Sequence, residues 1–185
     1  MPLVLASASP RRAELLIQAG FAFVVDAADV DERVRDGESP AAYVARVALD
    51  KARTVAARHP AAAVILAADT TVVAGGEILG KPLDNADAAR MLSLLSGSVH
   101  DVLTAVIVKH REVELAEVAR TRVHFIELTC EAIAWYVGTG EAEGKAGAYG
   151  IQGRAARFVD WIEGSWSNVV GLPVATVTRM LAEVV

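Results

Sequence analysis

The chain has 185 residues, a formal net charge of −5 and one cysteine, Cys130. This length allows one domain, or two small lobes that share a core, and the single cysteine excludes an intrachain disulfide bond. The acidic balance argues against non-specific nucleic-acid binding, and the lack of a signal-peptide pattern or an apolar run of about 20 residues predicts a cytoplasmic protein without a membrane span.

Apolar residues follow strand and helix periods in alternation along the chain. In order, the patterns predict strand 3–6, helix 10–19, strand 21–25, helix 40–58, strand 63–68, a hairpin of 71–73 and 77–79, helix 85–95 capped by Asn85, long antiparallel strands 99–109 and 114–127, helix 129–137 and helix 172–184. This order predicts an α/β fold with helices around a central, partly antiparallel sheet and no linker between domains.

The helix predicted at residue 10 begins with two arginines. Ser9 is a good N-cap and Pro10 suits the first helical position, but Arg11 and Arg12 put positive charge at the positive end of the helix dipole. A bound anion would resolve this conflict, and Ser7 with the backbone amides of the turn would add donors for phosphate. The alternative is that both arginines are solvated. If they grip an anion, removing Arg12 should weaken binding without destabilising the helix.

Two further charged residues stand beside apolar patterns. Asp69 directly follows the run AVILAA, so we expect it at the carboxyl end of a buried strand, as a metal ligand, a general base or only a turn cap. Lys51 falls inside the apolar stripe of the helix at 40–58; it either snorkels to solvent, the usual outcome, or meets an anion at the core edge. The acidic run at 26–32 is usually a solvated loop, but it could place Asp31 or Glu32 opposite Asp69. Such mixed charges are typical of metal-assisted phosphate chemistry.

A glycine-rich stretch near the C-terminal third has regular spacing. Gly144, Gly147, Gly150 and Gly153 fall at every third position. Four glycines are too few for a collagen-like repeat, so the spacing predicts a tight loop with exposed backbone. Such a loop either walls a ligand site or is ordinary turn chemistry, and the sequence leaves both open.

Seven segments resemble, in order, motifs of the Maf family of nucleoside triphosphate pyrophosphatases. They are ASASPRR, VDER, AADT, ILGKP, SGSVHDVLTAV, GKAGAYGIQG and GSWSNVVGLP. The resemblance implies a single Maf-like domain over residues 1–185, with an elongated mixed sheet, flanking helices and two lobes around a cleft, similar to inosine triphosphate pyrophosphatases. It also implies a cytoplasmic protein, often a homodimer.

The family hydrolyses a nucleoside triphosphate to the monophosphate and pyrophosphate with a divalent cation, so the resemblance implies Mg²⁺ or Mn²⁺ as cofactor. By motif, Asp69 would accept the proton of the attacking water, and Glu32 and Asp69 would hold the metal. The implied catalytic residues are Asp69, Lys51, Lys81 and Glu32, and the residues along the phosphate path are Ser7, Arg11, Arg12, Lys51 and Lys81.

Three positions imply the branch of the family that acts on dTTP and UTP. Arg11, Thr70 and Gln152 match that branch, whereas the branch acting on 7-methyl-GTP has tryptophan, glutamine and glutamate there. Gly144 departs from the family, because an aspartate usually precedes KAG, and Trp166 stands where tyrosine is commoner.

Two other functions remain open at the level of sequence. One is a nucleotide-binding regulatory protein that acts in septum inhibition or cell-division arrest. The other is a housecleaning hydrolase of modified pyrimidine nucleotides. The presence of Asp69 with Lys51 and Lys81 favours turnover over regulation, since binding alone needs no base.

Overall fold

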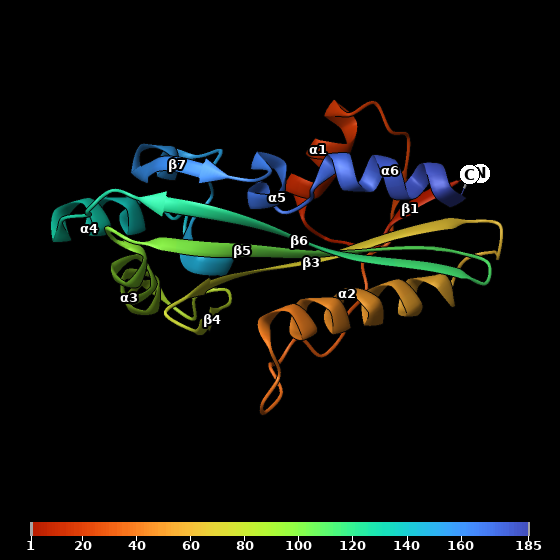
Figure 1. Cartoon of the computed structure of the whole chain (residues 1–185), viewed down its shortest axis with the longest axis horizontal. Coiled ribbons are helices and arrows are strands. Elements are labelled where there is room, and N and C mark those ends of the chain that lie inside the picture. Colours follow the sequence, from red (N-terminus) through yellow and green to blue (C-terminus); the bar gives the residue numbers. More distant parts are fainter. Residues whose placement is uncertain (1, 185) are drawn as a thin grey trace. The chain divides into compact units, whose positions relative to one another are not determined.

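The computed structural model describes residues 2–184, and within them seven strands form one mixed sheet with flanking helices (Figure 1). In chain order the elements are β1 (Leu3–Leu5), α1 (Pro10–Gln18), β2 (Val24–Val25), α2 (Pro40–Ala56), β3 (Val64–Ala74), β4 (Glu77–Leu79), α3 (Asn85–Leu95), β5 (Val99–His110), β6 (Val113–Phe125), α4 (Cys130–Gly138), the 3₁₀ helices η1 (Ala146–Ala148) and η2 (Arg154–Phe158), β7 (Val159–Glu163), α5 (Trp166–Val170) and α6 (Val174–Val184). The predicted α/β class is confirmed.

The sheet has the strand order β2-β1-β3-β5-β6-β7, and β4 pairs with β3. β1 runs parallel to both neighbours, whereas the β3–β4 and β6–β7 pairs are antiparallel. The predicted hairpin turn is present at Gly75-Gly76, whose φ angles of 56° and 83° require glycine-like freedom. None of the helices between residues 2 and 184 is both long and apolar enough to cross a membrane.

The chain divides into two compact units, which are described separately. Unit 1 comprises Met1–Thr70, Thr104–Ala119 and Gly171–Val185, and unit 2 comprises Thr71–Leu103 and Arg120–Val170. Strands β3, β5 and β6 each begin in one unit and end in the other. A single domain with two lobes and a cleft stays a prediction.

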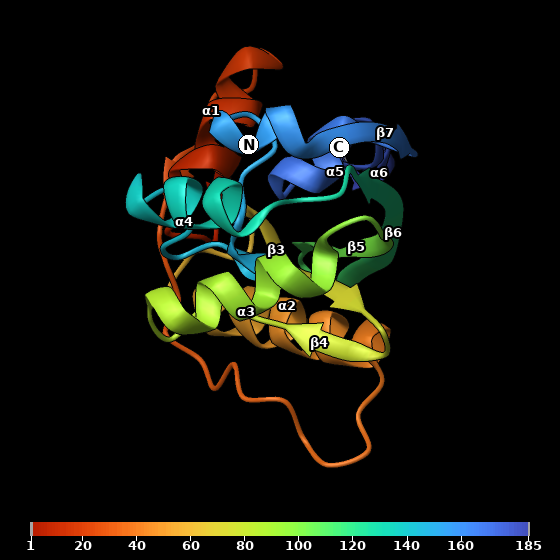
Figure 2. The same ribbon diagram turned by 90° about the vertical axis from the view of Figure 1, so that its left-hand side faces the viewer.

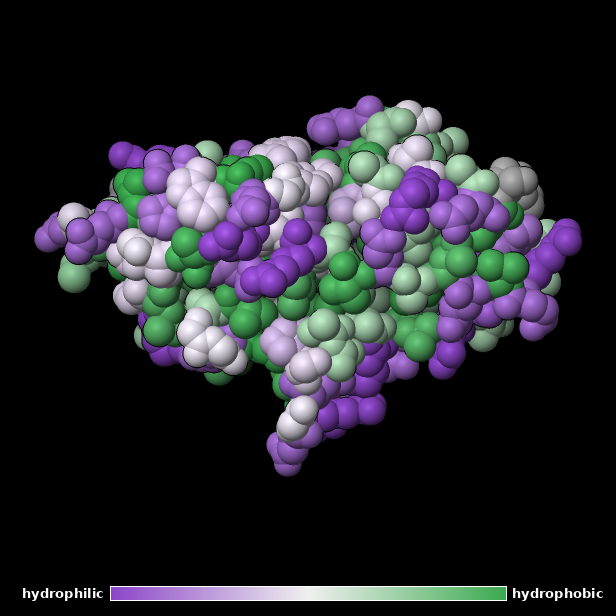
Figure 3. Space-filling view, in the orientation of Figure 1, coloured by the Kyte–Doolittle hydropathy of each residue, from purple (hydrophilic) through white to green (hydrophobic). Residues whose placement is uncertain are grey.

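Helix α2 packs on one face of the strands of unit 1, and α1 and α6 pack on the other (Figures 1 and 2). The apolar stripe of α2 explains its orientation, because Val44, Val47 and Val55 are fully buried. Ser39 caps this helix by accepting a hydrogen bond from the Ala42 amide at 3.3 Å. The segment that leads into α2 forms a hydrophilic projection (Figure 3).

Several predicted boundaries are wrong. β3 is one strand through Ala74, so Asp69 lies inside it instead of following it, because tertiary partners satisfy its polar group. The predicted helix 172–184 corresponds to α6 and begins two residues later, at Val174, whereas the short helix α5 before Gly171 was not predicted. Asp84, not Asn85, caps α3, since the Asp84 side chain accepts from the Asp87 amide at 2.8 Å. The second strand shrinks to Val24–Val25.

Unit 2 is built around buried aromatic rings that enclose a histidine. His100 is 2% exposed; its Nε2 lies 2.8 Å from the hydroxyl of Tyr149, and its ring meets Phe125 edge-on at 5.0 Å. Burial lowers the pKa of His100 to about 4, because a charged imidazolium loses its hydration there. His100 is therefore neutral in the folded protein at neutral pH.

This buried histidine predicts that the protein loses stability in mild acid. The unfolded chain binds the His100 proton near pH 6.5, whereas the folded chain binds it only near pH 4. The free energy of unfolding therefore falls as the pH falls from 6.5 to 4, by on the order of 3 kcal/mol from this group. Urea unfolding of wild type and His100→Gln at pH 7 and pH 4.5 measures the difference. Equal losses in both proteins would contradict the assignment.

Candidate active site

The structure brings most of the predicted site residues together in unit 1. Ser7, Arg11, Arg12, Glu32, Lys51, Asp69 and Thr70 belong to this unit, and Lys81 and Gln152 belong to unit 2. Within unit 1 the contacts form two groups, one around the ammonium of Lys51 and one around the guanidinium of Arg12. The groups adjoin on β3, where Asp69 contacts the first centre and Thr70 the second.

Lys51 joins two carboxylates at the edge of the core. Its Nζ lies 2.7 Å from Asp69 Oδ1 and 2.5 Å from Glu32 Oε1, and the residue is only 8% exposed. Of the two outcomes that the sequence left open for Lys51, the structure shows contact with anions at the core edge and not snorkelling to solvent. Lys51 follows Val47 by one helical turn, so α2 directs it inward, where the carboxylates compensate its charge. Asp31 instead pairs with Arg33 at the surface.

The carboxyl group of Asp69 is buried and has an altered acidity. Burial raises the pKa of Asp69, although Lys51 and Arg12 attract its negative charge and partly oppose the change. Asp69 therefore accepts a proton at a higher pH than an ordinary aspartate does. A carboxylate of this kind suits a general base.

A tyrosine on α2, Tyr43, contacts the segment that carries Glu32. Burial and the negative charges of Asp69 and Glu32 raise the pKa of Tyr43 to about 12. Its protonated hydroxyl donates to the backbone carbonyl of Glu32 at 3.0 Å. Tyr43 thus holds the segment that carries Glu32.

Arg12 is buried, and its guanidinium donates to three groups of the protein. Its Nε donates to the Gly171 carbonyl at 2.8 Å, Nη1 to Ser7 Oγ at 3.1 Å and Nη2 to Thr70 Oγ1 at 3.0 Å. The turn before α1, strand β3 and the segment after α5 therefore meet at one guanidinium. These tertiary bonds offset the unfavourable position of Arg12 in the helix dipole. Ser9 occupies the N-cap position but makes no side-chain capping bond.

The sequence interpretation missed two residues of this second group. Thr104 is fully buried, and its hydroxyl lies 2.9 Å from the hydroxyl of Thr70. Gly171 supplies a carbonyl to Arg12 from a backbone conformation with φ of 128°. Both residues fall inside recognised motifs, SGSVHDVLTAV and GSWSNVVGLP, so the motifs marked them without indicating what they do.

In unit 2, the predicted glycine loop is present and closely packed. A Cβ on Gly147 would come within 2.8 Å of the Val72 side chain, and its φ of 68° is unfavourable for other residues. The Gly150 amide donates to the hydroxyl of Tyr136 at 3.2 Å. Gln152 is exposed on this fixed loop, and Lys81 is exposed just after β4.

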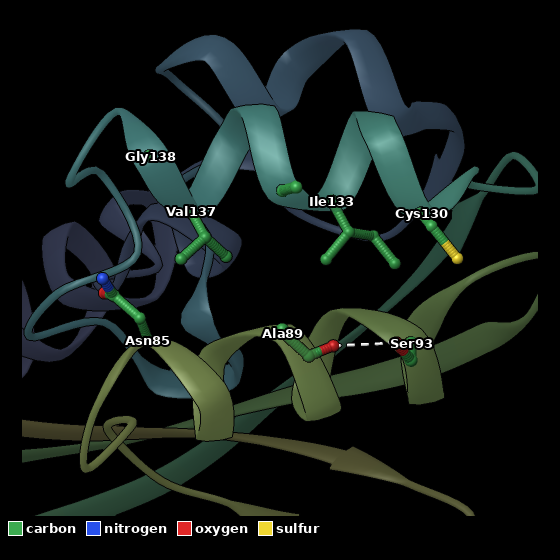
Figure 4. A pocket seen from close by; sticks show the side chains of 8 residues that line it. Asn85, Ala89, Ser93, Cys130, Ile133, Val137 and Gly138 are labelled. Carbon is green, nitrogen blue, oxygen red and sulfur yellow. Dashed lines mark hydrogen bonds between the residues drawn. The ribbon is translucent and has the colours of Figure 1, made fainter.

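A pocket of about 440 Å³ between α3 and α4 contains none of the predicted site residues (Figure 4). It is lined by Asn85, Ala89, Ser93, Cys130, Ile133, Ala134, Val137 and Gly138. This lining is mostly apolar and has no carboxylate, lysine or arginine. The candidate chemistry therefore belongs to the charged residues and not to this pocket.

Two carboxylates of unit 1 offer oxygen ligands of the kind that divalent metal ions bind. Across residues 2–184, no three side chains of His, Cys, Asp or Glu gather as a metal cluster. Asp69 and Glu32 are two carboxylates that share Lys51. Mg²⁺ is commonly bound by one or two carboxylates together with substrate phosphates, so this pair fits such an ion.

Residues 2–184 match the Maf family, described as Maf-like protein, and the chain belongs to that family. A relative from Anaeromyxobacter dehalogenans strain 2CP-1, named dTTP/UTP pyrophosphatase, is 55% identical over 97% of this chain and 92% of its own length. A relative of the same name from Symbiobacterium thermophilum is 52% identical over 98% of this chain and 93% of its own length.

A solved structure of a nucleoside-triphosphatase / dITP/XTP pyrophosphatase from Mycobacterium abscessus is a much more distant match. It is 19% identical, with a TM-score of 0.45, over 69% of this chain and 76% of that one.

The buried bonds of Arg12 predict that Arg12→Ala destabilises the protein, contrary to the expectation from the helix dipole. The change leaves three acceptors without their donor, at a cost on the order of 3 kcal/mol in the free energy of unfolding. Urea unfolding measures this cost. Arg33→Ala is the control, because the Arg33 side chain is 88% exposed and its loss should change stability little. Equal stability of the two variants would show that the Arg12 bonds contribute nothing.

Proposed function

We propose that the chain hydrolyses dTTP and UTP to the monophosphate and pyrophosphate. Membership of the Maf family and relatives above 50% identity named dTTP/UTP pyrophosphatase support this activity. The observation that carries it is the buried Asp69 carboxylate held by Lys51. A regulatory protein that only binds nucleotide is not favoured, since binding needs no buried base.

In the proposed reaction, the Asp69 carboxylate accepts a proton from water as the water attacks phosphorus and the bond between the α- and β-phosphates breaks. The proton moves to an oxygen of Asp69, and pyrophosphate leaves. The raised pKa of Asp69 brings its basicity closer to what proton transfer near neutral pH requires. Lys51 orients this carboxylate through its bond to Oδ1.

A divalent cation, Mg²⁺ or Mn²⁺, is the cofactor that we propose, with Asp69 and Glu32 as its protein ligands. When bound, such an ion neutralises phosphate charge and aligns the bond that breaks. Arg11, Arg12, Ser7, Lys51 and Lys81 are proposed to contact the phosphates, on the basis of the family motifs. The proposal of a homodimer rests on the resemblance alone, and the proposal of a cytoplasmic location rests on the resemblance together with the sequence patterns.

Gln152 is proposed to read the base, together with Arg11 and Thr70. Its amide offers one acceptor and two donors, which suits the adjacent N3–H and O4 of thymine and uracil. A flipped amide could also follow cytosine, so a second group must fix its orientation. Glutamate at this position would only accept hydrogen bonds, which does not suit O4.

The activity is tested by pyrophosphate release from dTTP, UTP, CTP, GTP and 7-methyl-GTP with Mg²⁺, with Mn²⁺ and with EDTA. We expect dTTP and UTP to be preferred and EDTA to stop turnover.

Asp69→Asn should lower kcat by about 10²–10⁴-fold, because the amide cannot accept the proton, whereas Asp160→Asn at an exposed carboxylate should not. For wild type, kcat/KM should rise with pH through the raised pKa of Asp69. Activity of Asp69→Asn within threefold of wild type would refute its role.

The base-reading role is tested by Gln152→Glu. We expect kcat/KM for dTTP and UTP to fall about tenfold, since one neutral hydrogen bond is lost, with a smaller effect on the other nucleotides. Gln18→Glu makes the same change at the only other glutamine of the chain and is the control. An equal loss for every nucleotide would mean that Gln152 does not read the base.

A further inference from the structure

The segment that carries Glu32 contains no helix or strand, yet helix α2 holds its backbone at three consecutive carbonyls. Arg46 donates from Nη1 to the Asp31 carbonyl at 3.2 Å and from Nη2 to the Arg33 carbonyl at 2.9 Å. Tyr43 donates to the Glu32 carbonyl between them at 3.0 Å. The backbone on both sides of Glu32 is therefore tied to one side chain, that of Arg46.

The same guanidinium also holds the far end of the segment. Arg46 Nε lies 2.7 Å from Glu38 Oε1, and Nη2 lies 2.9 Å from Glu38 Oε2. This forked pair is largely shielded, with side-chain exposures of 14% for Arg46 and 10% for Glu38. Arg46 lowers the pKa of Glu38 to about 2, so the pair stays ionised over the working range of the protein.

We propose that Arg46 is a positioning residue that fixes Glu32 beside Lys51. Glu32 reaches Lys51 Nζ at 2.5 Å only if residues 31–38 keep their folded path along α2. An irregular segment gains much conformational entropy when it is released, and Arg46 joins its start to its end. The consequence for catalysis rests on the proposed role of Glu32 as a metal ligand.

Arginine is required for this role because of its shape. One planar guanidinium binds two backbone carbonyls and both oxygens of a carboxylate, and a lysine ammonium is a point charge that cannot match this fork. Arg46→Lys keeps the charge and removes the geometry. Groups that orient a metal ligand typically change metal affinity by about 10–100-fold when they are replaced.

The clamp itself is tested without nucleotide or metal, by hydrogen–deuterium exchange with mass spectrometry. In Arg46→Lys we expect amides of residues 31–38 to exchange about tenfold faster than in wild type. The control is Arg53→Lys on the same helix, whose guanidinium bonds the Glu114 carboxylate at the surface; it should leave this exchange unchanged. Glu38→Gln keeps Arg46 but weakens its pair with residue 38, so it should also speed exchange. It is the second test variant if Arg46→Lys does not fold. Unchanged exchange in the folded variants would overturn the proposal.

The effect on Glu32 is tested by combining the substitutions. We expect Arg46→Lys to raise the Mn²⁺ concentration for half-maximal dTTP hydrolysis about tenfold, with KM for dTTP at saturating Mn²⁺ changed less than threefold. In a Glu32→Gln background the same substitution should have no further effect, because the group that it positions is gone. A full tenfold effect in that background would show that Arg46 acts elsewhere. If wild type does not hydrolyse dTTP, the proposed function fails, and the exchange experiment still decides whether the clamp exists.

Discussion

Two carboxylates and an ammonium lie together beside β3, and the folded path of unit 1 depends on their mutual compensation. Lys51 and Asp69 are both largely removed from water, which costs several kcal/mol per ion when a charge has no partner. Their contact requires α2 to lie over β3, and Glu32 completes the cluster only when the segment before α2 folds back. The apolar stripe of α2 supplies the burial that makes this arrangement favourable.

Arginine side chains then connect the irregular segments to the regular elements. Arg12 binds the carbonyl of Gly171 and the hydroxyls of Ser7 and Thr70, and Arg46 binds two carbonyls in the segment before α2. In each case one planar guanidinium donates hydrogen bonds to backbone carbonyls that have no partner within a helix or strand. Arg12 and the segment that carries Glu32 are thus held by bonds within the protein.

The interior of unit 2 is held by apolar and aromatic packing. Tyr136 anchors the glycine loop through the Gly150 amide, and His100 bonds Tyr149 from inside the aromatic core. The close approach of Gly147 to Val72 leaves no room for a side chain. Gln152 is exposed, and the loop that carries it has a fixed backbone.

The sequence by itself determined the α/β class, most helices and strands, the hairpin turn and the family, because these follow from local periodicity, turn residues and motif order. It also marked Asp69, Lys51 and Arg12 as unusual. Their partners were decided only by tertiary structure, since Lys51 and Asp69 are 18 residues apart and Arg12 and Gly171 are 159 apart. The sequence therefore left two outcomes open for Lys51, ended β3 too early and gave no sign of what Thr104, Gly171 or Arg46 contact. Local patterns report what a residue would do alone, whereas burial and pairing depend on which distant segments the sheet brings beside it.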